Sequence, residues 1–266
     1  MRVALVSLDQ VWQDKTANFA RCEILASEAK ALGCALLVFP EMTLTGYALD
    51  ASLAEPIEDA PSLRRFGELA RQYDLEVVFG AALRGEGDAR PRNTLCAALR
   101  DGRVDAVYTK LHPFTFAGEE KSYQAGQELA VFRAGGLRLG CGICYDLRFP
   151  EPFSAMAPDC DAFVVIANWP ARRVEHWRVL LRARAIENQC FVLGVNRIGQ
   201  DGNGLHFEHS SLLVAPDGEP VQPIAGQGEL EVFEIDPAET PRYRAAFPTV
   251  RDKRFMLYRR FLEAPQ

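Results

Sequence analysis

The sequence contains no apolar run approaching the ~18 residues that a membrane-spanning helix needs. Its first residues enter a strand pattern without the apolar segment and cleavage site of a secretory signal, so we expect no signal peptide. The net charge is −6 and no basic stripe is present, which argues against nucleic acid or an anionic membrane as a partner. These absences favour a globular cytoplasmic protein.

Cysteine is present in an odd number, seven residues spread from Cys22 to Cys190. Cys34, Cys96 and Cys190 lie in apolar segments, where cysteine behaves as a small buried hydrophobic residue. Because we expect no secretory signal, we expect these thiols to be reduced.

The spacing of apolar residues predicts one order of elements twice: strand, helix, strand, helix, and then three strands. In the first half these are residues 2–8, 15–32, 35–39, 62–73, 76–83, 94–100 and 104–109. In the second half they are residues 137–143, 146–157, 162–167, 174–189, 190–196, 210–215 and 229–235. Two such halves predict two sheets packed face to face with helices outside, a four-layer α-β-β-α sandwich. Since both sheets would share one core, we expect residues 1–266 to form a single domain.

The C-terminal stretch 240–266 is rich in arginine and aromatic residues and breaks this pattern. Two interpretations stay open. The stretch packs on its own domain, or it crosses to a partner subunit.

Cys144 is the first candidate for chemistry, because it lies between a predicted apolar strand and a predicted helix. A thiol near a helix N-terminus is favoured as a thiolate, and the free N–H groups there can receive an oxyanion. Its local context fits a buried structural cysteine equally well.

Cys141 and Cys144 also form a C-x-x-C pair, which leaves two other interpretations open. A zinc site needs further ligands, and His206 and His209 supply an H-x-x-H on a glycine-rich loop. A redox dithiol of the thioredoxin type does not suit a chain of this length. Along an unbroken strand the two thiols would face opposite sides, so we interpret Cys141 as structural.

A nucleophilic cysteine needs a base, and none of the four histidines has an obvious partner. Glu41 follows an apolar strand and lies between hydrophobic neighbours, where burial suits a carboxylate for proton transfer. Lys110 ends another predicted strand, where an ammonium would stabilise an oxyanion and hold Glu41. Taken separately, Glu41 and Lys110 each also fit a solvent-exposed charged residue at a strand end that has no catalytic role. Together with Cys144 they lie at carboxyl ends of strands, where sites assemble in α/β proteins.

Three runs containing these residues resemble the nitrilase (carbon–nitrogen hydrolase) superfamily: Phe39-Pro40-Glu41, Lys110-Leu111-His112 and Cys144-Tyr145-Asp146-Leu147-Arg148-Phe149-Pro150-Glu151. The last run is long and specific, and the resemblance covers essentially the whole chain. It implies that Cys144 attacks an amide carbon with Glu41 as general base and then acid. Lys110 and the backbone N–H of Tyr145 would stabilise the tetrahedral intermediate, ammonia would leave, and water would hydrolyse the thioester.

The family often carries a second glutamate after the lysine that positions the substrate. Glu119 and Glu120 are both candidates, and we prefer Glu119. The resemblance implies no metal and no organic cofactor. It implies a homodimer, for which the 240–266 tail would support the interface.

Among branches of the family, the chain is most similar to the omega-amidases, which hydrolyse short α-keto acid monoamides such as 2-oxoglutaramate and 2-oxosuccinamate. The similarity lies in residues 117–126, 167–173, 184–189 and 196–204. Such a small-molecule amide presents a free carboxylate, which an arginine would bind.

Arg173, or its neighbour Arg172, follows the Asn168-Trp169 loop and suits that role. Trp169 is expected either to line the pocket or to belong to the core. Arg148 is expected to pair with Glu151 or another carboxylate. Alternatives to an omega-amidase are another amidase or N-carbamoyl amidohydrolase of the same fold, and a binding protein without catalysis. Hydrolysis of a nitrile is not favoured.

Overall fold

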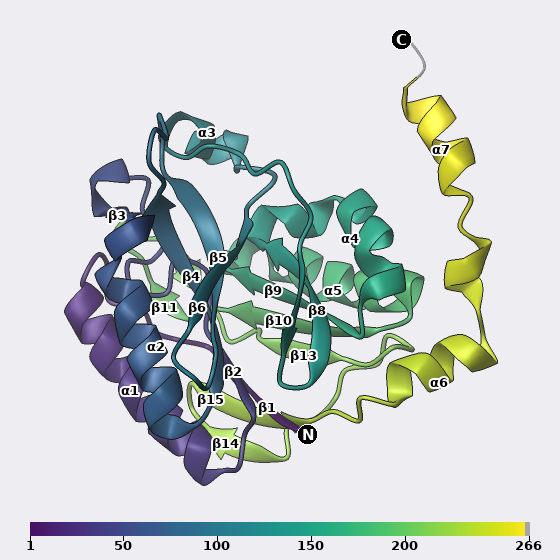
Figure 1. The fold of residues 1–266 in the computed structure, drawn as a ribbon, viewed down its shortest axis with the longest axis horizontal. Helices are drawn as coiled ribbons and strands as arrows, with labels where there is room; N and C mark the ends of the chain where they lie inside the picture. The colour runs from purple at the N-terminus through teal and green to yellow at the C-terminus, as the bar shows by residue number, and fades with distance from the viewer. Residues whose placement is uncertain (264–266) are drawn as a thin grey trace.

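Two β-sheets lie face to face at the centre of the molecule, with helices on their outer surfaces (Figure 1). The computed structural model describes residues 1–263. The first sheet has the order β14 (Ala225–Gln227), β15 (Leu230–Glu234), β1 (Arg2–Val6), β2 (Leu36–Val38), β4 (Glu76–Arg84), β5 (Arg92–Ala98) and β6 (Val104–Thr109), and β3 (Glu55–Pro56) pairs with β4. The second has the order β13 (Leu212–Val214), β10 (Phe191–Asn196), β9 (Ala162–Ala167), β8 (Leu137–Ile143) and β7 (Val131–Ala134). A small hairpin of β11 (Gly199–Gln200) and β12 (His206–Phe207) lies apart from both.

The core has three layers of apolar side chains. Side chains such as Leu5 and Val78 of the first sheet meet Ile143 and Leu193 of the second between the sheets. Helices α1 (Lys15–Ala31) and α2 (Pro61–Tyr73) cover the outer face of the first sheet, and α4 (Pro150–Met156) and α5 (Val174–Asn188) cover the second. Both faces of the central strands are therefore buried, which explains their continuous apolar runs. The predicted α-β-β-α sandwich is confirmed.

The prediction of two equal halves was wrong for the last strand. β15 pairs antiparallel with β1, from Arg2 opposite Glu234 to Val6 opposite Leu230, and so joins the first sheet. This pairing satisfies the backbone groups along one edge of β1, which would otherwise be exposed. The helix predicted at 146–157, with an interruption near Pro150 and Pro152, is interrupted at Pro150: η4 (Cys144–Arg148) ends before this proline and α4 begins there.

The C-terminal stretch has two parts. Helix α6 (Glu239–Ala246) lies against the body, where the Arg244 guanidinium donates to the carbonyls of Cys160 and Asn188 at 3.0 and 2.8 Å. Beyond η7 (Thr249–Asp252), helix α7 (Phe255–Leu262) extends away from the sandwich (Figure 1). The end of the predicted tail, 264–266, lies outside the described residues.

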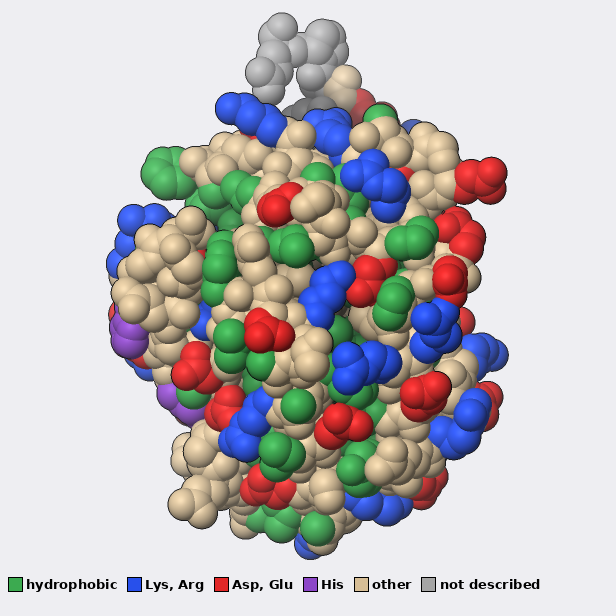
Figure 2. Space-filling model, turned by 90° about the vertical axis from the view of Figure 1, so that its left-hand side faces the viewer, with side chains coloured by type: hydrophobic (Ala, Val, Ile, Leu, Met, Phe, Trp, Pro, Cys, Tyr) green, Lys and Arg blue, Asp and Glu red, His purple; other side chains and the backbone are tan. Residues whose placement is uncertain are grey.

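The surface over α1 and α2 carries lysine, arginine, aspartate and glutamate side chains interspersed (Figure 2). This mixture agrees with the absence of a basic stripe in the sequence. None of the helices within residues 1–263 combines the length and the apolar character that crossing a membrane requires.

Candidate active site

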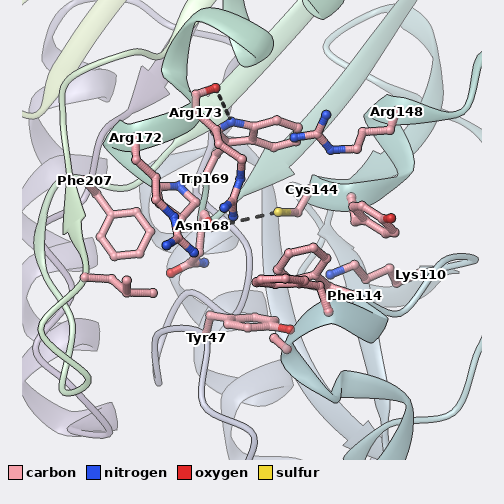
Figure 3. Close-up of a pocket in the computed structure, with 15 residues that line it drawn as sticks. Tyr47, Lys110, Phe114, Cys144, Arg148, Asn168, Trp169, Arg172, Arg173 and Phe207 are labelled. Atoms are coloured by element: carbon pink, nitrogen blue, oxygen red, sulfur yellow. Dashed lines mark hydrogen bonds between the residues drawn. The ribbon is translucent and has the colours of Figure 1, made fainter.

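Cys144 lies at the turn where β8 ends and η4 begins. Its φ of +47° is in the left-handed region, which a non-glycine residue rarely adopts. Such strain persists only where the surroundings hold it, and it is common at active sites. The thiol points toward the Asn168 backbone carbonyl at 3.9 Å (Figure 3).

The carboxylate of Asp146 holds this turn in place and accepts four hydrogen bonds. Oδ2 accepts from the Ile143 N–H at 3.0 Å and from the Tyr108 hydroxyl at 2.8 Å. Oδ1 accepts from the His112 backbone N–H at 2.9 Å and contacts His112 Nδ1 at 2.8 Å. Because Tyr108 and His112 flank Lys110 in sequence, Asp146 joins the cysteine turn of one sheet to the lysine segment of the other.

Glu41 follows β2 in a tight turn over β4. Gly80 of β4 allows this approach, since a Cβ at Gly80 would lie 2.3 Å from the Met42 nitrogen. The Gln10 side-chain amide donates to the carbonyls of Glu41, Met42 and Thr43 at 2.9–3.1 Å. The backbone of the glutamate is therefore fixed on both sides.

Lys110 lies between two carboxylates in the interior. Its ammonium donates to Glu41 Oε1 at 2.9 Å and to Glu119 Oε2 at 2.8 Å, and all three side chains are at most 1% exposed. The side-chain amide of Asn93 donates to the same two carboxylates, at 2.7 Å to Glu41 Oε1 and 3.0 Å to Glu119 Oε1. The backbone N–H of Asn168 donates to Glu41 Oε2 at 2.9 Å.

The charges of this cluster determine its protonation. Burial alone would lower the pKa of Lys110, but the carboxylates of Glu119 and Glu41 outweigh burial and hold that pKa well above its usual range. Burial alone would raise the pKa of Glu119, but Lys110, Asn93 and the Phe114 N–H together lower it. The lysine is thus a cation and Glu119 an anion at neutral pH.

The surroundings of Cys144 disfavour its thiolate form. Burial and the negative charge of Glu41 raise its pKa well above the usual value, although Lys110 acts in the opposite direction. The helical element that follows Cys144 is the short η4 rather than a long helix. The resting thiol therefore keeps its proton and needs a base to react.

A small pocket opens above the thiol, with a cavity volume of about 140 Å³. In Figure 3 Cys144 and Lys110 lie on the right of the view, with Arg148 above the thiol and Tyr47 at the bottom, while Arg172 and Arg173 lie on the left. Tyr47 also donates its hydroxyl to Glu119 Oε2 at 3.0 Å. The remaining lining residues are mostly aromatic or arginine: Phe114, Phe116, Ala117, Tyr145, Arg148, Asn168, Trp169, Pro170, Arg172, Arg173, Leu205 and Phe207.

The sequence model of the Carbon-nitrogen hydrolase family matches residues 2–245. The chain belongs to this family. This carbon–nitrogen hydrolase is 33% identical over 253 residues to the omega-amidase YafV of Escherichia coli (strain K12), covering 95% of this chain and 96% of that protein. It is 31% identical over 260 residues to the 2-oxoglutaramate amidase of Bacillus subtilis (strain 168), covering 96% and 98%.

Solved structures agree with these relatives. XC1258 of Xanthomonas campestris, a CN-hydrolase superfamily protein with an arsenic adduct in its active site, matches with a TM-score of 0.87 and 33% identity over 95% of this chain and 97% of that one. The amidase from Nesterenkonia sp. AN1, a mutant of which shows Michael addition of acrylamide at the active site cysteine, matches with a TM-score of 0.83 and 25% identity over 98% and 99%.

The structure of this carbon–nitrogen hydrolase brings most of the candidate residues together. Glu41, Lys110 and Glu119 form the buried cluster. Tyr145, Trp169 and Arg173 line the pocket, and Trp169 is also 3% exposed and packed in the core. Glu120 is not part of the cluster.

Arg148 and Cys141 lie outside the buried cluster. The expected pairing of Arg148 with a carboxylate is wrong: its guanidinium lies 4.7 Å from the Trp169 ring and 3.4 Å from His176 Nδ1. It lines the pocket instead. Cys141 is buried between the sheets, and within residues 1–263 no three His, Cys, Asp or Glu side chains are grouped as metal ligands.

Sequence reasoning missed the roles of Asn93, Asp146 and Tyr47. Asn93 precedes a predicted strand and carries no periodic signal, so only its contacts reveal it. Asp146 lies inside the C-Y-D-L-R-F-P-E run, where a carboxylate two residues after a cysteine at a turn is a signal that reasoning from the residues could have used.

Proposed function

We propose that this hydrolase cleaves the terminal amide of short α-keto acid monoamides, 2-oxoglutaramate or 2-oxosuccinamate, to ammonia and the dicarboxylate. One observation carries this proposal. The pocket above Cys144 is lined by Arg148, Arg172 and Arg173, and among residues 1–263 no carboxylate forms an ion pair with any of the three. Unpaired guanidinium groups beside a small cavity suit a short substrate with a free carboxylate.

In this mechanism the thiol proton of Cys144 passes to Glu41 as sulfur bonds to the amide carbon. The carbonyl oxygen becomes an oxyanion, which the third N–H of Lys110 and the backbone N–H of Tyr145 stabilise. Glu41 then gives the proton to the departing nitrogen, the C–N bond breaks, and ammonia leaves a thioester. Water then attacks the thioester carbon while Glu41 takes one of its protons. The C–S bond breaks, Glu41 returns the proton to the Cys144 sulfur, and the dicarboxylate product leaves.

Arg173 is the arginine that we assign to the substrate carboxylate. Burial and the neighbouring guanidinium groups of Arg172 and Arg148 lower its pKa, so an anion entering the pocket relieves repulsion among three cations. Its guanidinium lies 5.5 Å from the Phe114 ring on the pocket wall, which limits its movement. Trp169 and Tyr145 then border the carbon chain, and Glu119 positions the amide through Lys110.

A panel of amides assayed for ammonia release tests this function. We expect turnover of 2-oxoglutaramate or 2-oxosuccinamate to exceed that of N-carbamoyl amino acids and deaminated glutathione. Activity on a carbamoyl amino acid without activity on either keto-acid amide would instead support an N-carbamoyl amidohydrolase, the alternative within the family.

Arg173→Met is expected to raise KM for the keto-acid amides on the order of 10–100-fold, because a charged hydrogen bond to the carboxylate is lost. Turnover of a neutral amide such as propionamide should stay within about twofold. Arg182→Met, which removes a surface guanidinium paired with Glu219, is the matched control. It should change neither KM for the keto-acid amides nor the turnover of the neutral amide. Equal losses on charged and neutral amides would contradict the assignment of Arg173.

We also propose that the enzyme works in the cytoplasm as a homodimer. All seven cysteines are free, as suits a reducing compartment. Helix α7 extends from the body and exposes Phe255, Met256 and Tyr258, apolar surface that a second subunit would cover. Light scattering of the full chain tests the subunit number.

A further inference from the structure

Asn93 closes a ring of hydrogen bonds around the catalytic candidates, and the mechanism above gives Asn93 no role. The ring alternates two carboxylates with two donors: Glu41, Lys110, Glu119 and Asn93. The Asn93 side chain is 1% exposed, and its backbone carbonyl accepts the Lys110 N–H at 2.9 Å across β5 and β6. Asn93 therefore holds the lysine by its main chain and both carboxylates by its side chain.

The orientation of this amide is fixed by charge. Both N–H bonds of the Asn93 amide group are used, one for each carboxylate. Its oxygen accepts no hydrogen bond from the described residues and is buried. Rotating the amide would direct that oxygen at two anions, which costs more than leaving it without a donor. The side chain thus stays a double donor.

We propose that Asn93 is a positioning residue whose amide donor stabilises the Glu41 carboxylate by a hydrogen bond and selects which of its oxygens handles the proton. Oε1 of Glu41 accepts from both Asn93 and Lys110, so its lone pairs are occupied. Among residues 1–263, Oε2 accepts only from the Asn168 N–H, and Asn168 lies beside the Cys144 thiol. The less occupied oxygen is therefore the one on the side of the nucleophile. This inference rests on the proposed role of Glu41 as base.

The pH dependence of kcat/KM tests this proposal, with the amide from the panel that is turned over fastest. In Asn93→Leu the side chain keeps its size, but both N–H donors to the carboxylates are lost. The acidic limb of the profile, which reports protonation of the essential base in the free enzyme, should move upward by about one pH unit. Asn93→Thr keeps a single hydroxyl donor and should give a smaller upward shift.

Asn18→Leu is the matched control. Asn18 is also 1% exposed and donates both amide protons, but to the neutral carbonyls of Val11 and Leu44 at 2.7 and 2.8 Å. This variant should lose stability without moving the acidic limb. If Asn93→Leu does not fold, the position of the acidic limb in the kcat/KM profile of Asn93→Thr tests the proposal instead.

An acidic limb at its wild-type position in the folded Asn93 variants would overturn the proposal, as would an equal shift in Asn18→Leu. Failure of the proposed function has a different signature. In that case wild type would release no ammonia from the keto-acid amides, or Glu41→Gln would retain full activity on whichever amide is hydrolysed.

Discussion

Cys144→Ser is expected to lower kcat/KM for amide hydrolysis by at least ~10⁴-fold, in line with the loss of other catalytic nucleophiles. The hydroxyl has nearly the size of the thiol but is a much weaker nucleophile, and no described histidine contacts Cys144 to activate it. The fold should survive, because the left-handed turn is held by Asp146 rather than by sulfur. Ammonia release and thermal unfolding measured on the same preparation separate the two effects.

Cys141→Ala provides the matched control for that experiment. Cys141 is three residues upstream and buried between the sheets, away from the pocket lining. It should retain most of the activity, and iodoacetamide should still modify Cys144 in it. Loss of activity in Cys141→Ala to the level of Cys144→Ser would instead favour the dithiol interpretation of the C-x-x-C pair.

Lys110→Met is expected to abolish activity and to lower the free energy of unfolding by about 3–5 kcal/mol, the usual cost of breaking a buried ion pair. The variant leaves Glu41 and Glu119 facing each other with no ammonium between them, and both are fully buried. Denaturant unfolding at pH 8 measures the loss. In Lys15→Met, where the lysine is partly exposed and pairs with Glu55, the loss should stay within about 1 kcal/mol.

The pH dependence of this difference has a definite sign. In the wild type the lowered pKa of Glu119 stabilises the fold above the unfolded value of about 4.3, and that stabilisation is lost as pH falls through the folded value. The raised pKa of Lys110 stabilises the fold at every pH below about 10.4. In Lys110→Met the Glu119 carboxyl loses the ammonium that lowers its pKa, so it binds a proton at higher pH, which relieves the repulsion between the two carboxylates. The difference in the free energy of unfolding between wild type and Lys110→Met should therefore become smaller from pH 8 to pH 5. A difference that becomes larger over this range would contradict this account.

Strand and helix positions could be predicted largely from the sequence, because apolar periodicity follows burial. The strands at Val104–Thr109, Leu137–Ile143 and Ala162–Ala167 have the predicted limits. The pairing of β15 with β1 could not be predicted. An apolar run indicates that a strand is buried, but it does not indicate which strand pairs with it. The short β7 and β14 have weaker apolar patterns and were missed.

The candidate site divides in the same way. Glu41, Lys110 and Cys144 were predicted because they follow apolar strands, and the fold places them at one edge. The links between them were not predicted. Asn93 donates to two residues 52 and 26 positions away in the sequence, and such contacts leave no local pattern. Arg148 was misjudged for the same reason, because its aromatic partner lies on a different strand end.

The cluster draws on both sheets: Glu41, Lys110 and Asn93 come from the first, Cys144 and Asn168 from the second. The hydrogen bond from the Asn168 N–H to Glu41 joins them. A newly made chain whose sheets have not yet docked therefore carries a cysteine with no neighbouring base. The complete cluster therefore requires docked sheets, and regained activity during refolding is expected to report their docking.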